Sequence, residues 1–240
     1  MPAFETVFLR SEEVAEGTMA FHFARPAGFQ FQAGQAINVG LIDPPETDAK
    51  GNRRTFSIAS APFDNEIMIA TRMRDTAFKR VLKTMRAETK VRIQGPTGRF
   101  TLDAGDARPA VMIAGGIGIT PFLSIVHQAA HDALRRKLCL VYSNRRPEDA
   151  AFLAELMQLE GRNPNYRFLG TMVEMDKSAM PWKGERGLVD RALLERALGD
   201  LAAPTYYLAG PPGMVQAMSK LLVEAGVPQD RIRTDEFFGY

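Results

Sequence analysis

The sequence predicts two folded parts, an antiparallel β-barrel followed by a parallel sheet with flanking helices, which together form a β plus α/β fold. Residues 4–102 read as short strands of alternating apolar and polar residues between turns that contain proline and glycine, which is typical of antiparallel sheets. After residues 105–109 (GDARP), continuous apolar strands alternate with longer amphipathic helices, as in a parallel sheet covered on both faces. Since 240 residues suit two domains of ordinary size, we expect domains at residues 1–106 and 107–240.

The barrel half contains two clear strands and one helix. Residues 19–24 (MAFHFA) and 66–71 (EIMIAT) alternate in the manner of half-buried strands. Residues 77–85 instead place their large apolar side chains on one face of a helix. Either Thr76 or Asp75 is suited to cap this helix at its N-terminus.

The second half alternates strands and helices. Each expected strand is a continuous apolar run, and each expected helix has one apolar face. We expect strands at residues 110–114, 138–142, 166–170 and 205–209, and helices near residues 120–133, 148–158, 190–199 and 212–225.

Composition indicates a soluble globular protein. Hydrophobic residues make up 45% of the chain and charged residues 24%, which is enough apolar material for sizeable cores. The net charge of +2, with Lys and Arg spread along the chain, gives no reason to expect nucleic-acid binding. We expect a cytoplasmic location without membrane insertion, because the N-terminus lacks a signal-peptide pattern and no window approaches about 18 apolar residues.

The cysteine and histidine content argues against a metal site. The single cysteine, Cys139, lies in an apolar run, so it is expected to be a buried strand residue. One thiol excludes disulfides, cysteine zinc sites and iron–sulfur clusters within the chain. His127 and His131 share a helical face, but the acidic residue of the zinc motif H-E-x-x-H is missing. We therefore expect no metal ligands.

The most informative segment is residues 112–121 (MIAGGIGITP), in which an apolar strand breaks into three glycines and meets a Thr-Pro that can open a helix. Such a turn lets backbone N–H groups and the helix dipole approach a pyrophosphate. The alternative is an ordinary tight connection. Its spacing matches neither G-x-G-x-x-G nor the P-loop, which makes a P-loop kinase or ATPase improbable. We interpret the second half as a Rossmann-like nucleotide-binding domain.

The first half carries its own candidate ligand segment, residues 54–60 (RTFSIAS), which follows a flexible Lys50-Gly51-Asn52. Along an extended strand, a cation, an aromatic face and hydroxyl groups can line one ligand. The alternative is an ordinary strand with a surface arginine.

Taken together, these segments resemble the ferredoxin–NADP reductase superfamily, and the resemblance covers essentially the whole chain. Residues 54–60 match its flavin signature Arg-x-aromatic-Ser-x-x-Ser, and residues 31–35 (FQAGQ) look like the strand-to-turn element that precedes it. Residues 95–100 (GPTGRF) look like the last hairpin of the barrel. Residues 115–121 are similar to the nicotinamide-dinucleotide loop, and residues 209–214 (AGPPGM) correspond to the block Cys-Gly-Pro-Pro-Gly-Met.

The resemblance implies roles for individual residues. Arg54 would hold the flavin phosphate or pyrophosphate, and Phe56 would pack beside the isoalloxazine ring. Ser57 and Asp235 would adjust flavin N5 and its proton supply, and are the expected catalytic residues. The residues expected to contact flavin or nicotinamide dinucleotide are Arg54, Thr55, Phe56, Ser57, Ser60, Arg72, Thr76, Gly115, Gly116, Gly118, Thr120, Pro121, Ser143, Arg145, Arg146, Gly210, Pro211, Gly213, Met214, Phe237 and Tyr240.

Several positions depart from the family pattern. Ala209 replaces the cysteine beside the nicotinamide, so no thiol can position that ring. Thr76 and Lys79 stand where many relatives have Gly-x-x-Ser around the flavin pyrophosphate; FAD is favoured, with FMN as the alternative. Asp235 and Phe237 fit the usual C-terminal spacing. The three residues that follow either lay a ring over the flavin or dock on the surface.

The function implied by the resemblance is a flavoprotein reductase that passes hydride from NAD(P)H to FAD and electrons to a separate acceptor. The acceptor would be a ferredoxin, a flavodoxin, an oxygenase component or a small oxidant. Arg145 and Arg146 favour NADPH slightly, because arginines in this loop can pair with a 2′-phosphate, although relatives that use NADH also have arginine there. We expect a monomer or weak dimer.

Two other functions stay open. The chain could be a flavin reductase that uses flavin as a diffusible substrate, or an electron-transfer or regulatory subunit that is not catalytic alone. The basic helix face at Lys79, Arg80, Lys83 and Arg86 could dock an acidic partner or could simply be solvated.

Overall fold

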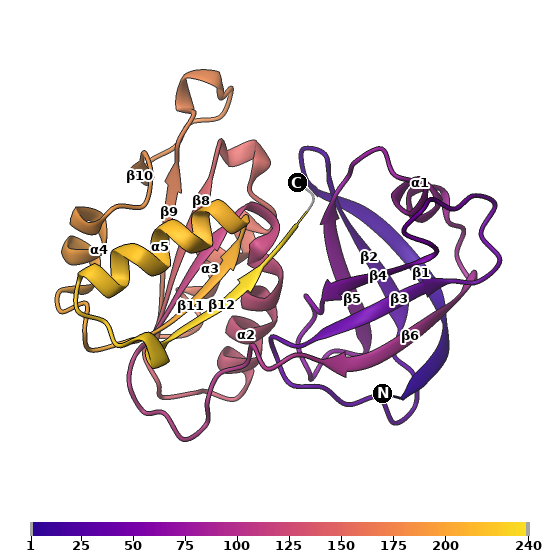
Figure 1. Ribbon diagram of the computed structural model, residues 1–240, viewed down its shortest axis with the longest axis horizontal. Helices are drawn as coiled ribbons and strands as arrows, with labels where there is room; N and C mark the ends of the chain where they lie inside the picture. The colour runs from indigo at the N-terminus through magenta and orange to yellow at the C-terminus, as the bar shows by residue number, and fades with distance from the viewer. Residues whose placement is uncertain (1, 239–240) are drawn as a thin grey trace.

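The computed structural model describes residues 2–238 and contains two six-stranded sheets that lie side by side (Figure 1). The N-terminal sheet is antiparallel, with strand order β4-β3-β6-β1-β2-β5. Its elements are β1 (Ala3–Ala15), β2 (Thr18–Ala24), β3 (Ala36–Leu41), β4 (Arg53–Ser57), β5 (Glu66–Arg72), α1 (Ala77–Thr84) and β6 (Lys90–Thr97). The sheet curls around one apolar core, as the alternating pattern predicts, because every second side chain of its strands points to the same face.

Helix α1 closes this core at one end. Its N-cap is Thr76, whose Oγ1 accepts a hydrogen bond from the Lys79 backbone N–H at 3.4 Å. Phe78, Val81 and Leu82 are buried in the barrel core, so the predicted apolar face is confirmed. Of the two cap residues considered, the structure selects Thr76.

The second sheet has the order β10-β9-β8-β7-β11-β12, and all of its strand pairs are parallel. Helices α2 and α3 cover one face, and α4 and α5 cover the other. The elements are β7 (Ala110–Gly115), α2 (Ile119–His131), β8 (Leu138–Asn144), α3 (Leu153–Leu159), β9 (Tyr166–Met172), β10 (Glu185–Arg186), α4 (Arg191–Leu198), β11 (Thr205–Gly210), α5 (Pro212–Glu224) and β12 (Ile232–Glu236). The predicted fold class is confirmed.

The order in which successive strands are added to this sheet changes direction between β7 and β11. From β7 the chain builds outward through β8 and β9, and it then returns to place β11 and β12 on the other side. Ligands of open parallel sheets bind outside the carboxyl ends of the strands at such a switch point. Both glycine-containing loops of the sequence, after Gly115 and at Gly210, lie there.

Three details differ from the sequence prediction. Residues 95–100 do not form a hairpin: β6 pairs with β1 and β3, and the chain then runs on to β7 in the other sheet. Helix α3 begins at Leu153 rather than near residue 148, because a 3₁₀ turn at Pro147–Asp149 and a left-handed Phe152 (φ 60°) precede it. Strands β10 and β12 were not predicted, because both are short edge strands without a continuous apolar run.

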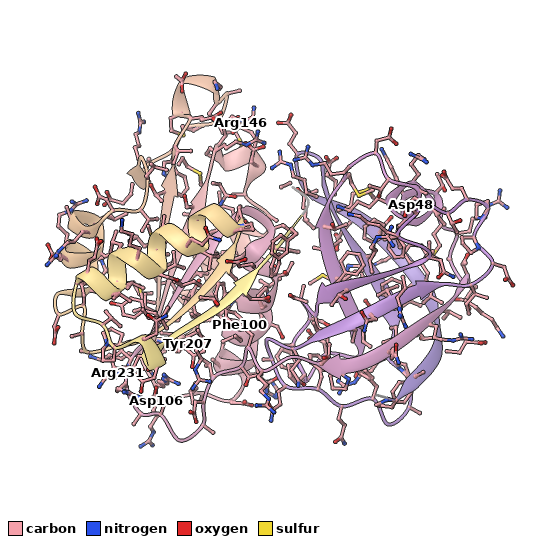
Figure 2. All side chains as sticks on the ribbon, in the orientation of Figure 1. Asp48, Phe100, Asp106, Arg146, Tyr207 and Arg231 are labelled. Atoms are coloured by element: carbon pink, nitrogen blue, oxygen red, sulfur yellow. The ribbon has the colours of Figure 1, made fainter. Side chains whose placement is uncertain are left out.

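The two halves meet through apolar packing and a few buried polar contacts. The Phe100 ring packs 5.9 Å from the Tyr207 ring, centroid to centroid, where the chain passes between the sheets (Figure 2). The Ser124 hydroxyl on α2 donates a 2.7 Å hydrogen bond to the Ser60 carbonyl in the barrel half. Gly34 has φ +95°, and a Cβ there would lie 3.1 Å from Cδ1 of Ile125 on α2. The halves are therefore closely fitted along this seam.

Asp106 anchors the connection between β6 and β7 to the second sheet (Figure 2). Its buried carboxylate accepts hydrogen bonds from Arg108 Nε at 2.7 Å, Arg136 Nη2 at 3.2 Å and Thr205 Oγ1 at 2.5 Å. The bond from Arg108, with those from Thr205 and the charge of Arg136, holds the pKa of Asp106 well below its ordinary value. The native state therefore favours the ionised carboxylate.

We predict that Asp106→Asn lowers the free energy of unfolding by about 2 kcal/mol at pH 7, because charge-assisted hydrogen bonds become neutral ones. A carboxylate with a depressed native pKa stabilises above its unfolded pKa of about 3.9, and this contribution is lost as the pH falls further. Urea denaturation at several pH values checks both points. The difference from the unmodified protein should shrink below about pH 4, whereas substitution of the exposed Asp230 should cost little at any pH.

Candidate functional site

A cavity of about 610 Å³ lies where the barrel meets the second sheet. The walls come from β4, β5 and the start of α1 on one side, and from the turn before α2 and the end of β12 on the other. Its volume is in the range of small-molecule and cofactor sites. Nine predicted site residues line it, namely the expected cofactor contacts Arg54, Thr55, Phe56, Ser57, Arg72, Thr76, Thr120 and Phe237 and the expected catalytic residue Asp235.

Arg54 lies at the start of β4, and the loop that precedes this strand holds its side chain in place. Its Nη1 donates hydrogen bonds to the carbonyls of Lys50, Gly51 and Arg53 at 2.8–2.9 Å, and its Nη2 lies 2.7 Å from the Asp48 carboxylate. The guanidinium also sits over the Phe78 ring, 5.2 Å from its centroid. The cation is therefore preorganised at the edge of the cavity. Asp48 was not predicted as a site residue, because it lies in the loop before the strand and outside the motif.

The middle of β4 supplies an aromatic wall and a hydroxyl. The ring of Phe56 lies 5.9 Å from that of Phe78 at an interplanar angle of 33°, so the core of the barrel supports it from behind. Ser57 is buried at the end of the strand, opposite Ala36 of β3. An aromatic surface beside a buried hydroxyl suits one edge and one face of a planar heteroaromatic ring.

The second half presents a carboxyl group to the same cavity. Asp235 lies on β12 opposite Ala209 of β11, and burial raises the pKa of its carboxyl above the ordinary value. It therefore keeps a proton to higher pH than an exposed aspartate. The structure thus brings the two predicted catalytic residues, Ser57 and Asp235, into one cavity, while their roles stay predictions.

The end of β12 bridges the two halves. The backbone N–H of Phe237 donates to the Gly210 carbonyl at 2.9 Å, and its ring packs against a small apolar cluster that contains Ala20, Ala70 and Ile117. Phe238 lines the cavity with 79% of its surface exposed. Tyr240, which was also predicted to contact the cofactor, lies outside the described residues.

The two glycine-containing loops pack directly against each other at the switch point. A Cβ on Gly118 would lie 2.3 Å from the Ala209 carbonyl oxygen, and one on Gly115 would lie 2.4 Å from the Met214 sulfur. Gly210 has φ +152° and backs onto the Gly115 backbone. These three glycines are thus required for close approach of loop to loop. Open space surrounds the two remaining glycines, Gly116 and Gly213.

The remaining predicted residues differ in their surroundings. Thr120 is buried, and its Oγ1 donates to the Ile117 carbonyl at 3.1 Å. Pro121 is buried in α2. Pro211 and Met214 pack on Gly115. Ser60 stands outside the cavity, where its Oγ accepts a 2.9 Å hydrogen bond from the Met68 N–H.

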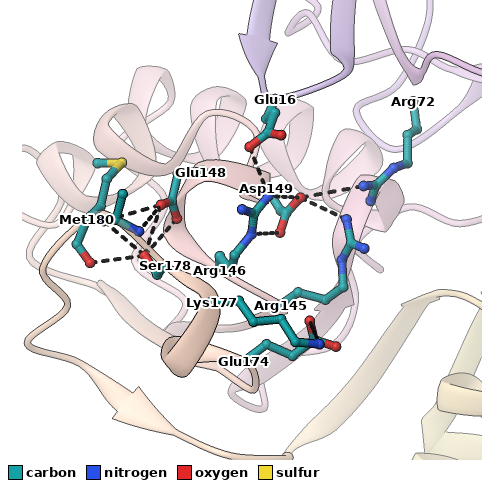
Figure 3. Close-up of polar contacts among 11 residues, drawn as sticks. Glu16, Arg72, Arg145, Arg146, Glu148, Asp149, Glu174, Lys177, Ser178 and Met180 are labelled. Atoms are coloured by element: carbon teal, nitrogen blue, oxygen red, sulfur yellow. Dashed lines mark hydrogen bonds and ion pairs between the residues drawn. The ribbon is translucent and has the colours of Figure 1, made fainter.

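Arg145 and Arg146 follow β8, next to Ser143, and both point to one buried carboxylate, Asp149 (Figure 3). Arg145 Nη2 lies 2.8 Å from Asp149 Oδ1, and Arg146 Nε lies 2.9 Å from Oδ2. Arg146 Nη2 also lies 2.8 Å from Glu16 Oε2 in the barrel half. The Asp149 side chain is only 3% exposed.

Arg72 connects this cluster to the cavity. It lines the cavity, and its Nη2 lies 3.5 Å from Asp149 Oδ1 (Figure 3). Asp149 therefore joins arginines of both halves, and the three cations lower its pKa against the opposing effect of burial. The sequence pointed to Arg145 and Arg146 as free cations and did not single out Asp149, which lies in the same loop.

Two further expectations can be compared with the structure. Cys139 is buried in β8, as predicted, and burial raises the pKa of its thiol to about 11. No helix within residues 2–238 is long and apolar enough to cross a bilayer.

A barrel and a parallel sheet that share a cavity, with two glycine-containing loops at the switch point, define the chain as a two-part oxidoreductase fold. Residues 112–220 match the family model described as "Oxidoreductase NAD-binding domain". The chain is 28% identical to "Ferredoxin--NADP reductase B" of Sorangium cellulosum over 231 residues, which cover 91% of this chain and 90% of the relative. The chain is thus similar to ferredoxin–NADP reductases over most of its length, and the predicted resemblance is confirmed.

Further similarities agree with this family. The chain is 30% identical over 220 residues to the reductase component of propane 2-monooxygenase from Rhodococcus jostii, which covers 88% of this chain and 57% of the relative. A solved ferredoxin NADP+ reductase from Neisseria gonorrhoeae with bound FAD and NADP has the same fold, with a TM-score of 0.83, 23% identity and coverage of 98% and 99% of the two chains. The chain spans about 60% of the length of the monooxygenase reductases that it matches.

Proposed function

We propose that this chain is a flavoprotein reductase that transfers hydride from NAD(P)H to bound FAD and then passes electrons to a separate acceptor. The observation that carries this function is the single cavity that gathers Arg54, Phe56 and Ser57 from the barrel with Thr120 and Asp235 from the second sheet. In this reading, residues 1–106 form the FAD-binding domain and residues 107–240 the NAD(P)-binding domain. The names of its relatives support a ferredoxin or an oxygenase component as acceptor; a flavodoxin is the further alternative.

The residues of the cavity fit FAD in charge and shape. Arg54 and Arg72 supply positive charge for phosphate groups, and Phe56 offers a ring surface for stacking. The Ser57 hydroxyl and the Asp235 carboxyl are polar groups that would hydrogen-bond at the edge of the ring. When bound, FAD supplies the exchange between two-electron and one-electron transfer. The chain's own contribution is to bind and orient, because transfer needs two rings in near contact.

The absorption spectrum of the purified protein, followed by anaerobic titration with NADH and NADPH, tests this function. We expect a flavin spectrum that either nucleotide bleaches, and steady reduction of ferricyanide. Protein that takes up no FAD during reconstitution would refute the proposal. Colourless protein that reduces added flavin in solution would instead favour the alternative in which flavin is a diffusible substrate.

The choice between NADPH and NADH is predicted to depend on Arg145 more than on Arg146. Arg145 is 46% exposed and has one carboxylate partner, whereas Arg146 is held by both Asp149 and Glu16. Arg145→Ala should therefore raise the KM for NADPH about tenfold and change that for NADH little. Steady-state kinetics with both nucleotides measure this. Equal losses for NADH and NADPH would contradict a 2′-phosphate contact.

A further inference from the structure

The cavity contains a lysine whose charge no carboxylate balances. Lys79 lies in the first turn of α1 and lines the cavity. Its Nζ donates a 2.7 Å hydrogen bond to the backbone carbonyl of Arg72 on β5. Within residues 2–238, none of the ion pairs includes Lys79. An ammonium has three donors, so two of them stay available to a ligand.

The sequence suggested two places for this residue, one near the flavin pyrophosphate by resemblance and one on an outer helix face. It grouped Lys79 with Arg80, Lys83 and Arg86 on a basic helix face that could dock a partner. The structure separates them: Arg80, Lys83 and Arg86 are exposed, whereas Lys79 is partly buried and turned to the cavity. A buried cation is costly unless something compensates its charge.

The charged side chains around Lys79 carry a net positive charge. The segment before its helix adds Arg74, β4 adds Arg54, and β5 adds Arg72, while Lys50 also lines the cavity. The acidic groups that line the cavity are Asp48, Asp235 and Glu236. Asp48 is already paired with Arg54 at 2.7 Å, and burial keeps Asp235 protonated to higher pH. A ligand with several negative charges would complete this charge balance.

We propose that Lys79 binds the diphosphate of FAD through an ammonium–phosphate ion pair. This inference rests on the proposed function and adds to it a specific anion-binding residue. The N-cap Thr76 and the N–H groups of the first turn lie beside Lys79, and helix N-termini favour phosphate. Lys79 and Arg54 then approach the diphosphate from two different elements, which fixes its position between α1 and β4.

The ion pair makes FAD affinity depend on pH in a defined window. Burial, followed by the charges of Arg74 and Arg54, lowers the pKa of Lys79 to about 8. Phosphate binds the protonated amine, so affinity is full below about pH 8 and falls as the pH rises through that value. Between pH 7 and pH 9 the Kd for FAD should rise about tenfold.

The test compares the flavin-free protein with its Lys79→Met, Lys79→Arg and Lys83→Met variants. Lys83→Met is the matched control, because Lys83 is an exposed lysine of the same helix that does not line the cavity. Quenching of flavin fluorescence gives the Kd for FAD and for riboflavin at pH 7 and pH 9. Riboflavin has the same ring and no phosphate, so it reports on folding and ring binding alone.

We expect Lys79→Met to raise the Kd for FAD at pH 7 about tenfold or more, to abolish its pH dependence and to leave riboflavin binding unchanged. Lys79→Arg should retain affinity at pH 7. Equal losses for FAD and riboflavin, or no loss for FAD, would overturn the role of Lys79. Should unmodified protein bind no flavin, the proposed function itself fails; should it bind FAD while Lys79→Met binds equally well, only the inference about Lys79 fails.

Discussion

Arg54→Ala is expected to weaken FAD binding by about 10- to 150-fold, so that the protein is purified largely without flavin. A hydrogen-bonded contact between guanidinium and phosphate contributes about 1.5 to 3 kcal/mol. Arg54 is already fixed at the cavity mouth by three carbonyls and Asp48, so little ordering is needed when a ligand binds. The flavin content of purified protein, and the Kd for FAD by fluorescence, measure the loss.

Arg54 also organises the loop before β4, and a second variant separates this structural role from phosphate binding. Asp48→Asn removes the only acidic partner of Arg54 among residues 2–238 but keeps the guanidinium. If Arg54 binds phosphate, Asp48→Asn should bind FAD at least as tightly as the unmodified protein, because a competing negative charge is gone. A loss in Asp48→Asn that equals the loss in Arg54→Ala would show that Arg54 acts only through the loop.

The sequence predicted those features that depend on local pattern. Strand alternation located β2 and β5, and apolar runs located β7, β8, β9 and β11 to within two residues at each end. Residues 54–57 were identified because an arginine, an aromatic residue and hydroxyl groups alternate along one strand, and this strand does form a wall of the cavity. Local periodicity carries such information because side-chain direction follows from backbone repeat.

Features that depend on contacts across the sheets were not predictable. β12 is a polar edge strand that is defined by its pairing with β11, so its own residues do not predict it. Arg145 and Arg146 looked like free cations, because nothing in the sequence brings Glu16 of the barrel to Arg146. Lys79 was grouped with a basic helix face that either docks a partner or is solvated, and only the hydrogen bond from its amine to the Arg72 carbonyl of β5 shows that the amine turns inward.

The glycines of residues 115–118 show both what a sequence pattern predicts and what it leaves undetermined. Their spacing indicated a loop that lets backbone approach an anion, and the structure shows a second reason for two of them. Gly115 and Gly118 allow the loop after β7 to touch the loop after β11. A sequence pattern reports that a side chain is excluded, but it cannot say whether a ligand or another part of the chain excludes it.

Gly118→Ala is therefore expected to damage the nicotinamide side of the site and to spare the flavin side. The new Cβ would lie 2.3 Å from the Ala209 carbonyl oxygen and 2.7 Å from the Gly210 Cα, so the two loops must separate by about 1 Å. A misplacement of this size between reacting groups costs about 100-fold in rate. Stopped-flow bleaching of the flavin by NADH or NADPH measures hydride transfer, and the flavin content should stay unchanged.

Gly213→Ala is the matched control, because it adds the same methyl group to the partner loop where no atom lies within 4 Å. We expect Gly213→Ala to leave the contact between the loops intact and therefore to lower the hydride-transfer rate less than Gly118→Ala does, since its added methyl meets no atom of the chain. If Gly118→Ala and Gly213→Ala reduce the rate equally, glycine is needed in these loops for flexibility or for ligand approach, and the close contact between the loops does not govern transfer. If Gly118→Ala transfers hydride at the normal rate, the switch point is not where the nicotinamide is positioned.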